Sequence, residues 1–255
     1  MCLIAWKWQP GEETPLLLLA NRDEYYQRAA LPVHWWEGNQ VLAGQDLQAG
    51  GTWLGVSRSG RLAALTNYRQ FPLSPQARPS RGALVLEFLQ GQDSALDYLT
   101  LVQAQSAQYN PFNLLVFDGH HLMGLESRHA RILSMPHGMG AVSNADFHSP
   151  WPKLSRLREH LEQAARRGET SHAHLWPLLQ HRAAAPDAQL PQTGIPLELE
   201  RALSSTFIAL PDYGTRASSI IHLGSRQIMF AEQSYTAQGP AGQVSWQFEI
   251  ERPMA

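Results

Sequence analysis

The sequence has only one cysteine, Cys2, among its 255 residues. An intramolecular disulfide is therefore excluded, which fits a reducing compartment. Long apolar runs are also missing, since the run at residues 16–20 is far too short to span a bilayer. Glu12 and Glu13 precede that run and do not suit the basic start of a secretory signal peptide. We expect a cytoplasmic protein with no membrane span.

Charge is scarce as well. Charged residues make up 16% of the chain and the formal net charge is -2, whereas roughly 25% is usual for soluble domains. No basic stripe indicates nucleic-acid binding, and no acidic tail or internal repeat is visible. Hydrophobic residues make up 44% of the chain, so a sizeable core is available. No segment resembles a linker, and we expect one domain over residues 1–255.

The apolar patterning predicts an α+β protein. Strands are predicted at residues 2–8, 16–21, 53–57, 61–67, 113–118, 122–126, 131–135, 216–223, 227–234 and 243–251. Helices are predicted at residues 84–89, with Ser80 as the N-cap, and at 95–102, 152–166 and 172–182. Residues 183–200 are rich in Ala, Pro and Gln and predict a surface loop. This order suits two sheets packed face to face with helices outside.

Cys2 is the first residue whose side chain could act as a nucleophile. A small side chain after the initiator methionine permits removal of Met1. Cys2 would then carry a thiol with a pKa near ~8.5 and a free α-amino group with a pKa near ~7.7–8.0. Such an amine can take the thiol proton near neutral pH, so that no histidine is required. The alternative is a small buried residue at the start of an edge strand.

Four polar residues, Asn21-Arg22-Asp23-Glu24, directly follow the apolar run at residues 16–20. A hairpin of the first two predicted strands would bring them back beside Cys2. A guanidinium near a thiol lowers its pKa and can hold a carboxylate in a bidentate manner. Asp23 could orient the α-ammonium group or the thiol. The alternative is a surface ion pair that contributes little to stability.

These segments resemble a known family. Met1-Cys2, Asn21-Arg22-Asp23-Glu24 and Gly50-Gly51-Thr52-Trp53-Leu54-Gly55 occur in the order found in the NRDE-motif family, also called the transport and Golgi organisation family. Residues 64–69 and 213–216 match it too, so the resemblance covers nearly the whole chain. It implies a single four-layer αββα sandwich of the N-terminal-nucleophile hydrolase type. Some members of the family have been linked to haem trafficking.

A weaker resemblance is to the choloylglycine hydrolase and penicillin V acylase group, whose members start Met-Cys and use the cysteine to cleave amides. It implies catalytic roles for a set of polar residues: Cys2, Arg22, Asp23, Asn67, Asn144 and Arg216. One spacing differs, because two residues separate the Arg from the Asp in the acylases, whereas Arg22 and Asp23 are adjacent. Adjacent residues on an extended strand point to opposite faces. Both can face Cys2 only if the chain bends there.

The other polar residues of this set have roles that chemistry suggests independently. The side-chain amides of Asn67 and Asn144 suit donors to the oxyanion of a tetrahedral intermediate. For Asn144 the alternative is ordinary turn chemistry. Arg216 could neutralise a substrate carboxylate, pair with Asp23, or be a solvated turn residue. We expect Arg22, Asn67, Asn144 and Arg216 to converge on Cys2, in a pocket lined by Trp and Leu side chains.

Other patterns indicate no cofactor site. Gly50-Gly51 is followed by no lysine and no helix, so it is not a phosphate loop. The eleven histidines include no HExxH pattern, and we expect no metal site. A single axial histidine that binds haem has no recognisable sequence pattern, so the sequence does not exclude haem as a ligand. Two functions fit a small-molecule or hydrophobic ligand. One is a cysteine-dependent hydrolase of an amide or related acyl bond, which needs no cofactor. The other is a non-catalytic carrier or chaperone of a hydrophobic ligand, with haem as a candidate.

Overall fold

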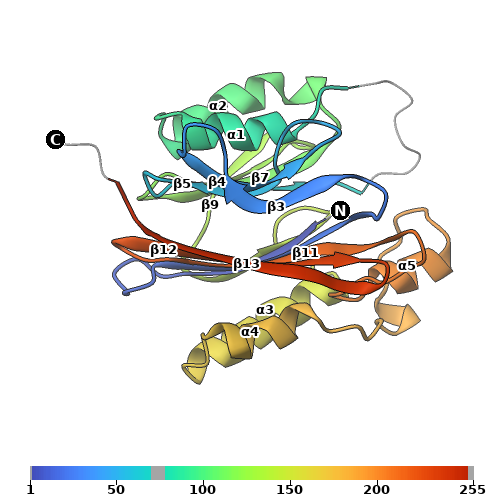
Figure 1. The fold of residues 1–255 in the computed structure, drawn as a ribbon. Coiled ribbons are helices and arrows are strands. Elements are labelled where there is room, and N and C mark those ends of the chain that lie inside the picture. The colour runs from blue at the N-terminus through green and yellow to red at the C-terminus, as the bar shows by residue number, and fades with distance from the viewer. Residues whose placement is uncertain (1, 70–77, 252–255) are drawn as a thin grey trace.

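The computed structural model describes residues 2–69 and 78–251, and the predicted removal of Met1 concerns a residue outside them. Two antiparallel sheets are stacked face to face, and helices cover the outer face of each (Figure 1). The predicted α+β class and αββα layering are confirmed. None of the helices in the described part of the chain combines the length and apolar character needed to cross a membrane.

The first sheet contains the N-terminal strand and has the order β10-β1-β2-β11-β12-β13. Its strands are β1 (Cys2–Trp8), β2 (Leu16–Tyr25), β10 (Gly138–Val142), β11 (Tyr213–Leu223), β12 (Gln227–Thr236) and β13 (Gly239–Glu249). Its outer face is covered by α3 (Pro152–Arg166) and α4 (His172–Leu179). The short helix α5 (Leu197–Leu203) precedes β11. Because β1 lies between β10 and β2, Cys2 does not start an edge strand.

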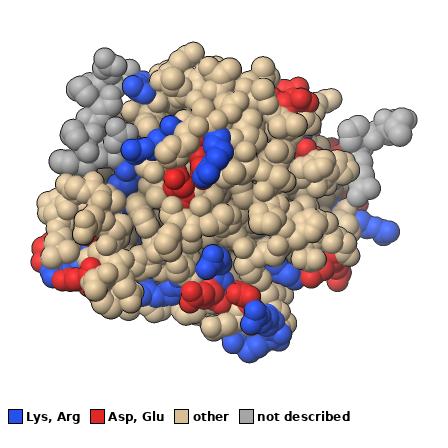
Figure 2. Space-filling view, turned by 180° about the vertical axis from the view of Figure 1, so that it is seen from behind, with Lys and Arg blue, Asp and Glu red and all other residues tan. Residues whose placement is uncertain are grey.

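The second sheet has the order β3-β4-β5-β6-β7-β8-β9. Its strands are β3 (Ala30–Trp35), β4 (Val41–Asp46), β5 (Leu54–Ser57), β6 (Leu62–Asn67), β7 (Phe112–Phe117), β8 (Leu122–Glu126) and β9 (Arg131–Ser134). The helices α1 (Gly82–Gln90) and α2 (Ala95–Gln105) pack on its outer face. Charged side chains are sparse on the surface shown in Figure 2, where cationic and anionic residues lie close to one another.

The strands β1 and β2 are apolar on both faces because both faces are covered. Ile4 and Trp6 point into the core between the two sheets, whereas Leu3 and Ala5 pack under α3 and α4. The near-continuous apolar runs of the sequence therefore reflect a sheet buried between two layers. The indole of Trp6 lies directly on the backbone of β10.

Several predicted boundaries are wrong. The strands β3 and β4 were not predicted, because the edge strand β3 is half-exposed and contains Pro32, so it lacks a clear apolar alternation. The predicted loop at 183–200 includes the start of α5. Ser80 does not cap α1, since the residue before that helix is Arg81 in a helical conformation. The helix predicted to reach residue 182 ends at Leu179.

The contact between Trp6 and β10 generates a prediction. A Cβ atom added at Gly140 would lie 2.2 Å from Cζ2 of Trp6, so Gly140→Ala should destabilise the protein by about 1–3 kcal/mol through overpacking. The free energy of unfolding from denaturant titration measures this. In a Trp6→Leu background the indole is gone, and the same glycine substitution should be less destabilising. An equal loss in both backgrounds would contradict the steric explanation.

Candidate functional site

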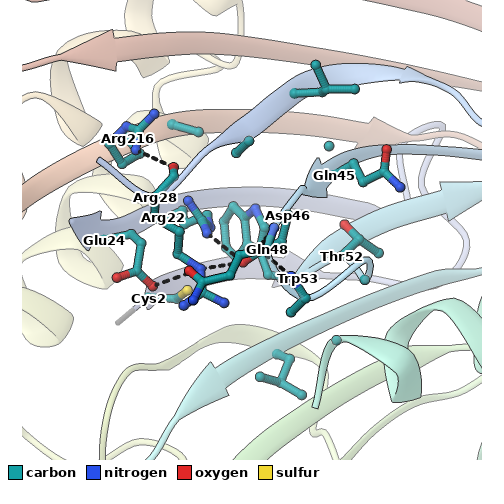
Figure 3. Close-up of a pocket in the computed structure, with 18 of the residues that line it drawn as sticks. Cys2, Arg22, Glu24, Arg28, Gln45, Asp46, Gln48, Thr52, Trp53 and Arg216 are labelled. Atoms are coloured by element: carbon teal, nitrogen blue, oxygen red, sulfur yellow. Dashed lines mark hydrogen bonds and ion pairs between the residues drawn. The ribbon is translucent and has the colours of Figure 1, made fainter. Parts of the chain in front are cut away.

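Cys2 lines a cavity of about 620 Å³ between the two sheets. The cavity is bordered by the ends of β2, β4, β6, β11 and β12 and by the start of α1, and Figure 3 shows its side chains around Cys2. Its lining includes Trp53, Leu31 and Leu65, so Trp and Leu side chains are present in the pocket around Cys2, as expected. The lining also contains five arginines and four acidic residues, so the cavity is more polar than the sequence suggested.

Cys2 is positioned by its pairing with Arg22 in the β1–β2 register. Both side chains lie on the face that looks toward the second sheet, where Arg22 donates from Nη2 to Oδ2 of Asp46 at 3.2 Å. The adjacent Asp23 points to the opposite face and reaches the layer below α3. The strand β2 continues through this point, and the extra residue opposite it, between Thr215 and Ala217, belongs to β11. Strand alternation therefore separates the side chains of Arg22 and Asp23.

The thiol of Cys2 is buried, with 6% of the residue exposed. Burial raises its pKa to about 11, because the thiolate would lose hydration. Arg22 opposes this shift, whereas Asp23 and Glu24 add to it. The thiol in this structure is therefore protonated at neutral pH. A nucleophilic role requires a base that takes its proton.

Asp46 joins the two sheets at the cavity. Its Oδ2 accepts hydrogen bonds from Arg22 on the first sheet and, at 2.7 Å, from Nε of Arg28, as Figure 3 shows. Its Oδ1 accepts from the main-chain nitrogens of Gln48 and Ala49. Burial acts to raise the pKa of Asp46, but these hydrogen bonds hold the pKa below its ordinary value. The carboxylate is therefore ionised, and it fixes the guanidinium of Arg22 beside Cys2.

Asp23 forms a second, fully buried network behind Cys2. Its Oδ1 accepts from Oγ1 of Thr215 at 2.8 Å, and its Oδ2 lies 3.7 Å from Nζ of Lys153. Burial raises the pKa of Asp23, an effect that Lys153 opposes. Burial lowers the pKa of Lys153 to about 8, although Asp23 favours its charged form. A charged pair at this depth is retained at an energetic cost, which suggests that the two residues have a role beside Cys2.

Lys153 is not among the site residues predicted from the sequence, although its position in the helix indicates that it is buried. It lies in the first turn of α3 with Leu157 and Leu161 at spacings of four residues, on the stripe that packs against the sheet. A lysine on an apolar stripe has to find a buried anionic partner. That partner, Asp23, is 130 residues away along the chain, so the pattern alone does not identify it.

The two asparagines meet beside Cys2, but they differ in availability. Asn144 is completely buried and donates from Nδ2 to the main-chain oxygen of Asn67 at 2.9 Å. Its Oδ1 accepts from Ser143, whose hydroxyl also donates to the main-chain oxygen of Cys2. Asn67 lines the cavity, and its side-chain amide makes no hydrogen bond to the residues described in 2–69 and 78–251. Asn67 is therefore the asparagine whose amide can donate to a ligand.

Arg216 lines the cavity too, but away from the carboxyl group of Asp23. It is the extra residue at the bulge of β11. Its Nη1 donates to the main-chain oxygens of Tyr25, Tyr26 and Arg28, each at 2.9 Å, and one of these contacts is drawn in Figure 3. The structure thus gives Arg216 a positioning role, because it holds the turn that follows β2 against β11.

No group of three or more His, Cys, Asp or Glu residues that could hold a metal ion is found in the described part of the chain. The lining of the cavity includes no histidine and no methionine among the described residues. Its sulfur atom is the protonated thiol of Cys2. The chemistry that this cavity offers is therefore that of a buried thiol surrounded by guanidinium, carboxyl and amide groups.

Comparisons with known proteins agree with the motifs. Residues 1–237 match the family model described as Transport and Golgi organisation 2. The chain is 36% identical over 264 residues to the Transport and Golgi organization protein 2 homolog of Bos taurus, covering 94% of this chain and 95% of that protein. It is 35% identical over 262 residues to the Homo sapiens homolog, covering 92% and 93%.

Among solved structures, the C2A mutant of conjugated bile acid hydrolase from Clostridium perfringens has a similar fold. The TM-score is 0.51 with 9% sequence identity, and the match covers 100% of this chain and 99% of that one. At this identity the likeness shows the fold alone, which is that of the N-terminal-nucleophile hydrolases.

The buried thiol generates a prediction about pH. In protein that retains Met1, alkylation of Cys2 by iodoacetamide should still be accelerating at pH 10, since its pKa is raised to about 11. At pH 8 the reaction should be slower than that of an exposed cysteine of ordinary pKa by roughly two orders of magnitude. Mass spectrometry of the alkylated protein over a pH series measures this. A plateau between pH 8 and 9 would contradict the burial of the thiol.

The buried pair of Lys153 and Asp23 generates a second prediction. Lys153→Met removes the ammonium partner of a buried carboxyl group, and the protein should lose about 3–5 kcal/mol of unfolding free energy. Asp23→Asn should also destabilise. The double variant should lose clearly less than the sum of the two, because it leaves neither charge without its partner. Denaturant titration of the four proteins tests this, and additive losses would show that the two side chains do not interact.

Proposed function

We propose that this chain, which belongs to the Transport and Golgi organisation 2 family, is a cysteine-dependent hydrolase of an amide or related acyl bond with Cys2 as its nucleophile. The observation that supports this most is the position of Cys2 as the first residue of β1, with its thiol lining a cavity beside Arg22. Removal of Met1 would convert the main-chain nitrogen of Cys2 into an α-amino group. The nucleophile and its base would then belong to one residue.

The reaction would proceed by acyl transfer. The α-amine takes the proton of the Cys2 thiol as the sulfur attacks the carbonyl carbon, and the carbonyl π electrons move to the oxygen. When the tetrahedral intermediate collapses, the carbon–nitrogen bond breaks and the leaving amine receives that proton. A thioester of Cys2 remains. Water, deprotonated by the same amine, then releases the acid and restores the thiol.

The surrounding residues suit this sequence of steps. Arg22 favours the thiolate form of Cys2, and Asp46 holds the guanidinium of Arg22 in place. The cavity-facing amide of Asn67 is the donor we assign to the oxyanion. Asn144 acts indirectly, since its Nδ2 fixes the main chain of Asn67. Arg22, Asp46 and Asn67 lie on strands, and Asn144 lies two residues after β10.

The network of Asp23 and Lys153 suits the control of the amine. Because β1 and β2 are antiparallel and Cys2 pairs with Arg22, Asp23 lies just beyond the N-terminal side of Cys2. A carboxyl group there can accept a hydrogen bond from an α-amine. The ammonium group of Lys153, on the far side of Asp23, is a nearby positive charge. It disfavours protonation of the α-amine, which would add a second positive charge. A neutral amine is the form that acts as a base.

A carrier function is the alternative, and the raised pKa of Cys2 favours it. With Met1 retained the thiol is almost entirely protonated at neutral pH, yet the cavity remains able to hold a ligand. The fit to haem is poor in one respect, because the lining residues described here include neither histidine nor methionine as an axial ligand. Such a carrier would better suit a metal-free hydrophobic ligand with an anionic group.

The cysteine variant separates the two functions. On a panel of acyl amides, Cys2→Ser should retain the fold and lose turnover by on the order of 10³-fold or more, as removal of a nucleophile does in other acyl-transfer enzymes. Binding of the substrate to Cys2→Ser, measured by calorimetry, should remain within a few-fold of the wild type. Hydrolysis that persists in Cys2→Ser, or ligand binding by wild type with no turnover of any panel member, would contradict the hydrolase proposal.

A further inference from the structure

Five arginines line the cavity, and four of them are held by groups of the protein itself. Arg22 and Arg28 share the carboxylate of Asp46. Arg216 donates to four main-chain oxygens. Arg78 donates to two main-chain oxygens, at 3.2 and 2.6 Å. Each of these four side chains is therefore bound either to a carboxylate or to at least two main-chain oxygens of the protein.

Arg81 differs from them. It is half-buried at the start of α1, and its polar contact is a 3.3 Å hydrogen bond from Nη1 to the main-chain oxygen of Pro111. No carboxylate of the described residues lies within ion-pair distance of it. Burial lowers the pKa of Arg81, while Cys2 and Glu24 favour its charged form. Arg81 and Cys2 both line the cavity, and most of the donors of Arg81 are still available.

The glycine before Thr52, Gly51, explains why Arg81 keeps this position. A Cβ atom on Gly51 would lie 2.7 Å from the carbonyl carbon of Gly82, so only glycine allows the loop before β5 to contact the start of α1. Thr52 donates from its main-chain nitrogen to the oxygen of Gly82 at 3.4 Å. The loop thus anchors the residue next to Arg81 against the second sheet.

The charge of the cavity is incomplete without a ligand. Its lining includes five arginines and four acidic residues, but Asp23 points away from the cavity and pairs with Lys153. Five arginines are therefore opposed by three acidic residues, and burial raises the pKa of one of these, Glu232, to about 7, so positive charge is in excess. A guanidinium removed from bulk water is stabilised when an anion contacts it. A carboxylate offsets part of this excess, and its two oxygens match the fork of a guanidinium.

We propose that Arg81 binds a carboxylate of the ligand and that the cavity selects molecules that carry this group close to the acyl group reaching Cys2. The proposal rests on the proposed function in taking Cys2 as the reacting residue. Arg81 is then a specificity-determining residue, distinct from Arg22, whose guanidinium is committed to Asp46. A ligand without the carboxylate would leave Arg81 half-buried and without a counter-charge.

The test compares two reagents of nearly equal size that alkylate Cys2, anionic iodoacetate and neutral iodoacetamide. The measured quantity is the ratio of their rate constants, divided by the same ratio for N-acetylcysteine. A change in the thiol pKa affects both reagents equally and cancels. Wild type should give a normalised ratio raised by about ten-fold or more, the effect of a charged hydrogen bond. Arg81→Gln should return it to about one, and Arg81→Lys, which keeps the charge, should retain part of the increase.

Arg78→Gln is the matched control, since it removes an arginine of the same cavity that is already held by carbonyl groups. It should keep the wild-type ratio. A wild-type ratio near one overturns the proposal without any variant. The proposal can therefore be tested even if Arg81→Gln fails to fold. An equal fall of the ratio in Arg78→Gln also overturns the proposal. The preference for iodoacetate would then come from the overall positive charge of the cavity and not from a contact with Arg81. The assay needs no turnover, so its failure is distinguishable from failure of the hydrolase proposal.

Discussion

The position of β2 between β1 and β11 is the constraint on which the site depends. Because β2 is paired on both sides and covered on both faces, each side chain of the Asn21–Glu24 segment has to enter one of two buried spaces. Arg22 and Glu24 enter the cavity between the sheets. Asn21 and Asp23 enter the layer below the helices, where Asn21 donates to the main-chain oxygens of Leu179 and Thr206. One short polar segment therefore forms both the wall of the site and its support.

The edge of the core near Cys2 is held by polar contacts between the two sheets. Asn113 on β7 donates to the main-chain oxygen of Ala145, just after β10, at 2.8 Å. Asn144 donates to the main chain of Asn67, and the main-chain nitrogen of Arg69 donates to the oxygen of Asn144 at 2.7 Å. Buried networks of this kind are favourable only when their members find partners, and they then fix one arrangement. The apolar core lies beyond them, so the site is rigid where the sheets would otherwise be free to separate.

Local patterns predicted much of this structure. The N-terminal hairpin follows from two apolar runs, and its register places Arg22 opposite Cys2. The partners that complete the site were not predictable in the same way, because they depend on how the sheets and helices meet. Asp46 belongs to a hairpin whose half-exposed edge strand lacks apolar alternation. Lys153 has a helical position that signals burial, but the identity of its partner is a tertiary property.

The central claim is that Cys2 becomes the first residue of the protein and so acquires its own base. The mass of the intact protein, purified without an N-terminal tag, tests this most directly when it is measured on a preparation active against an acyl amide. The account predicts a mass lower by one methionine residue than that of the full sequence, and an N-terminal peptide that begins at Cys2. An active preparation in which Met1 is fully retained would contradict it.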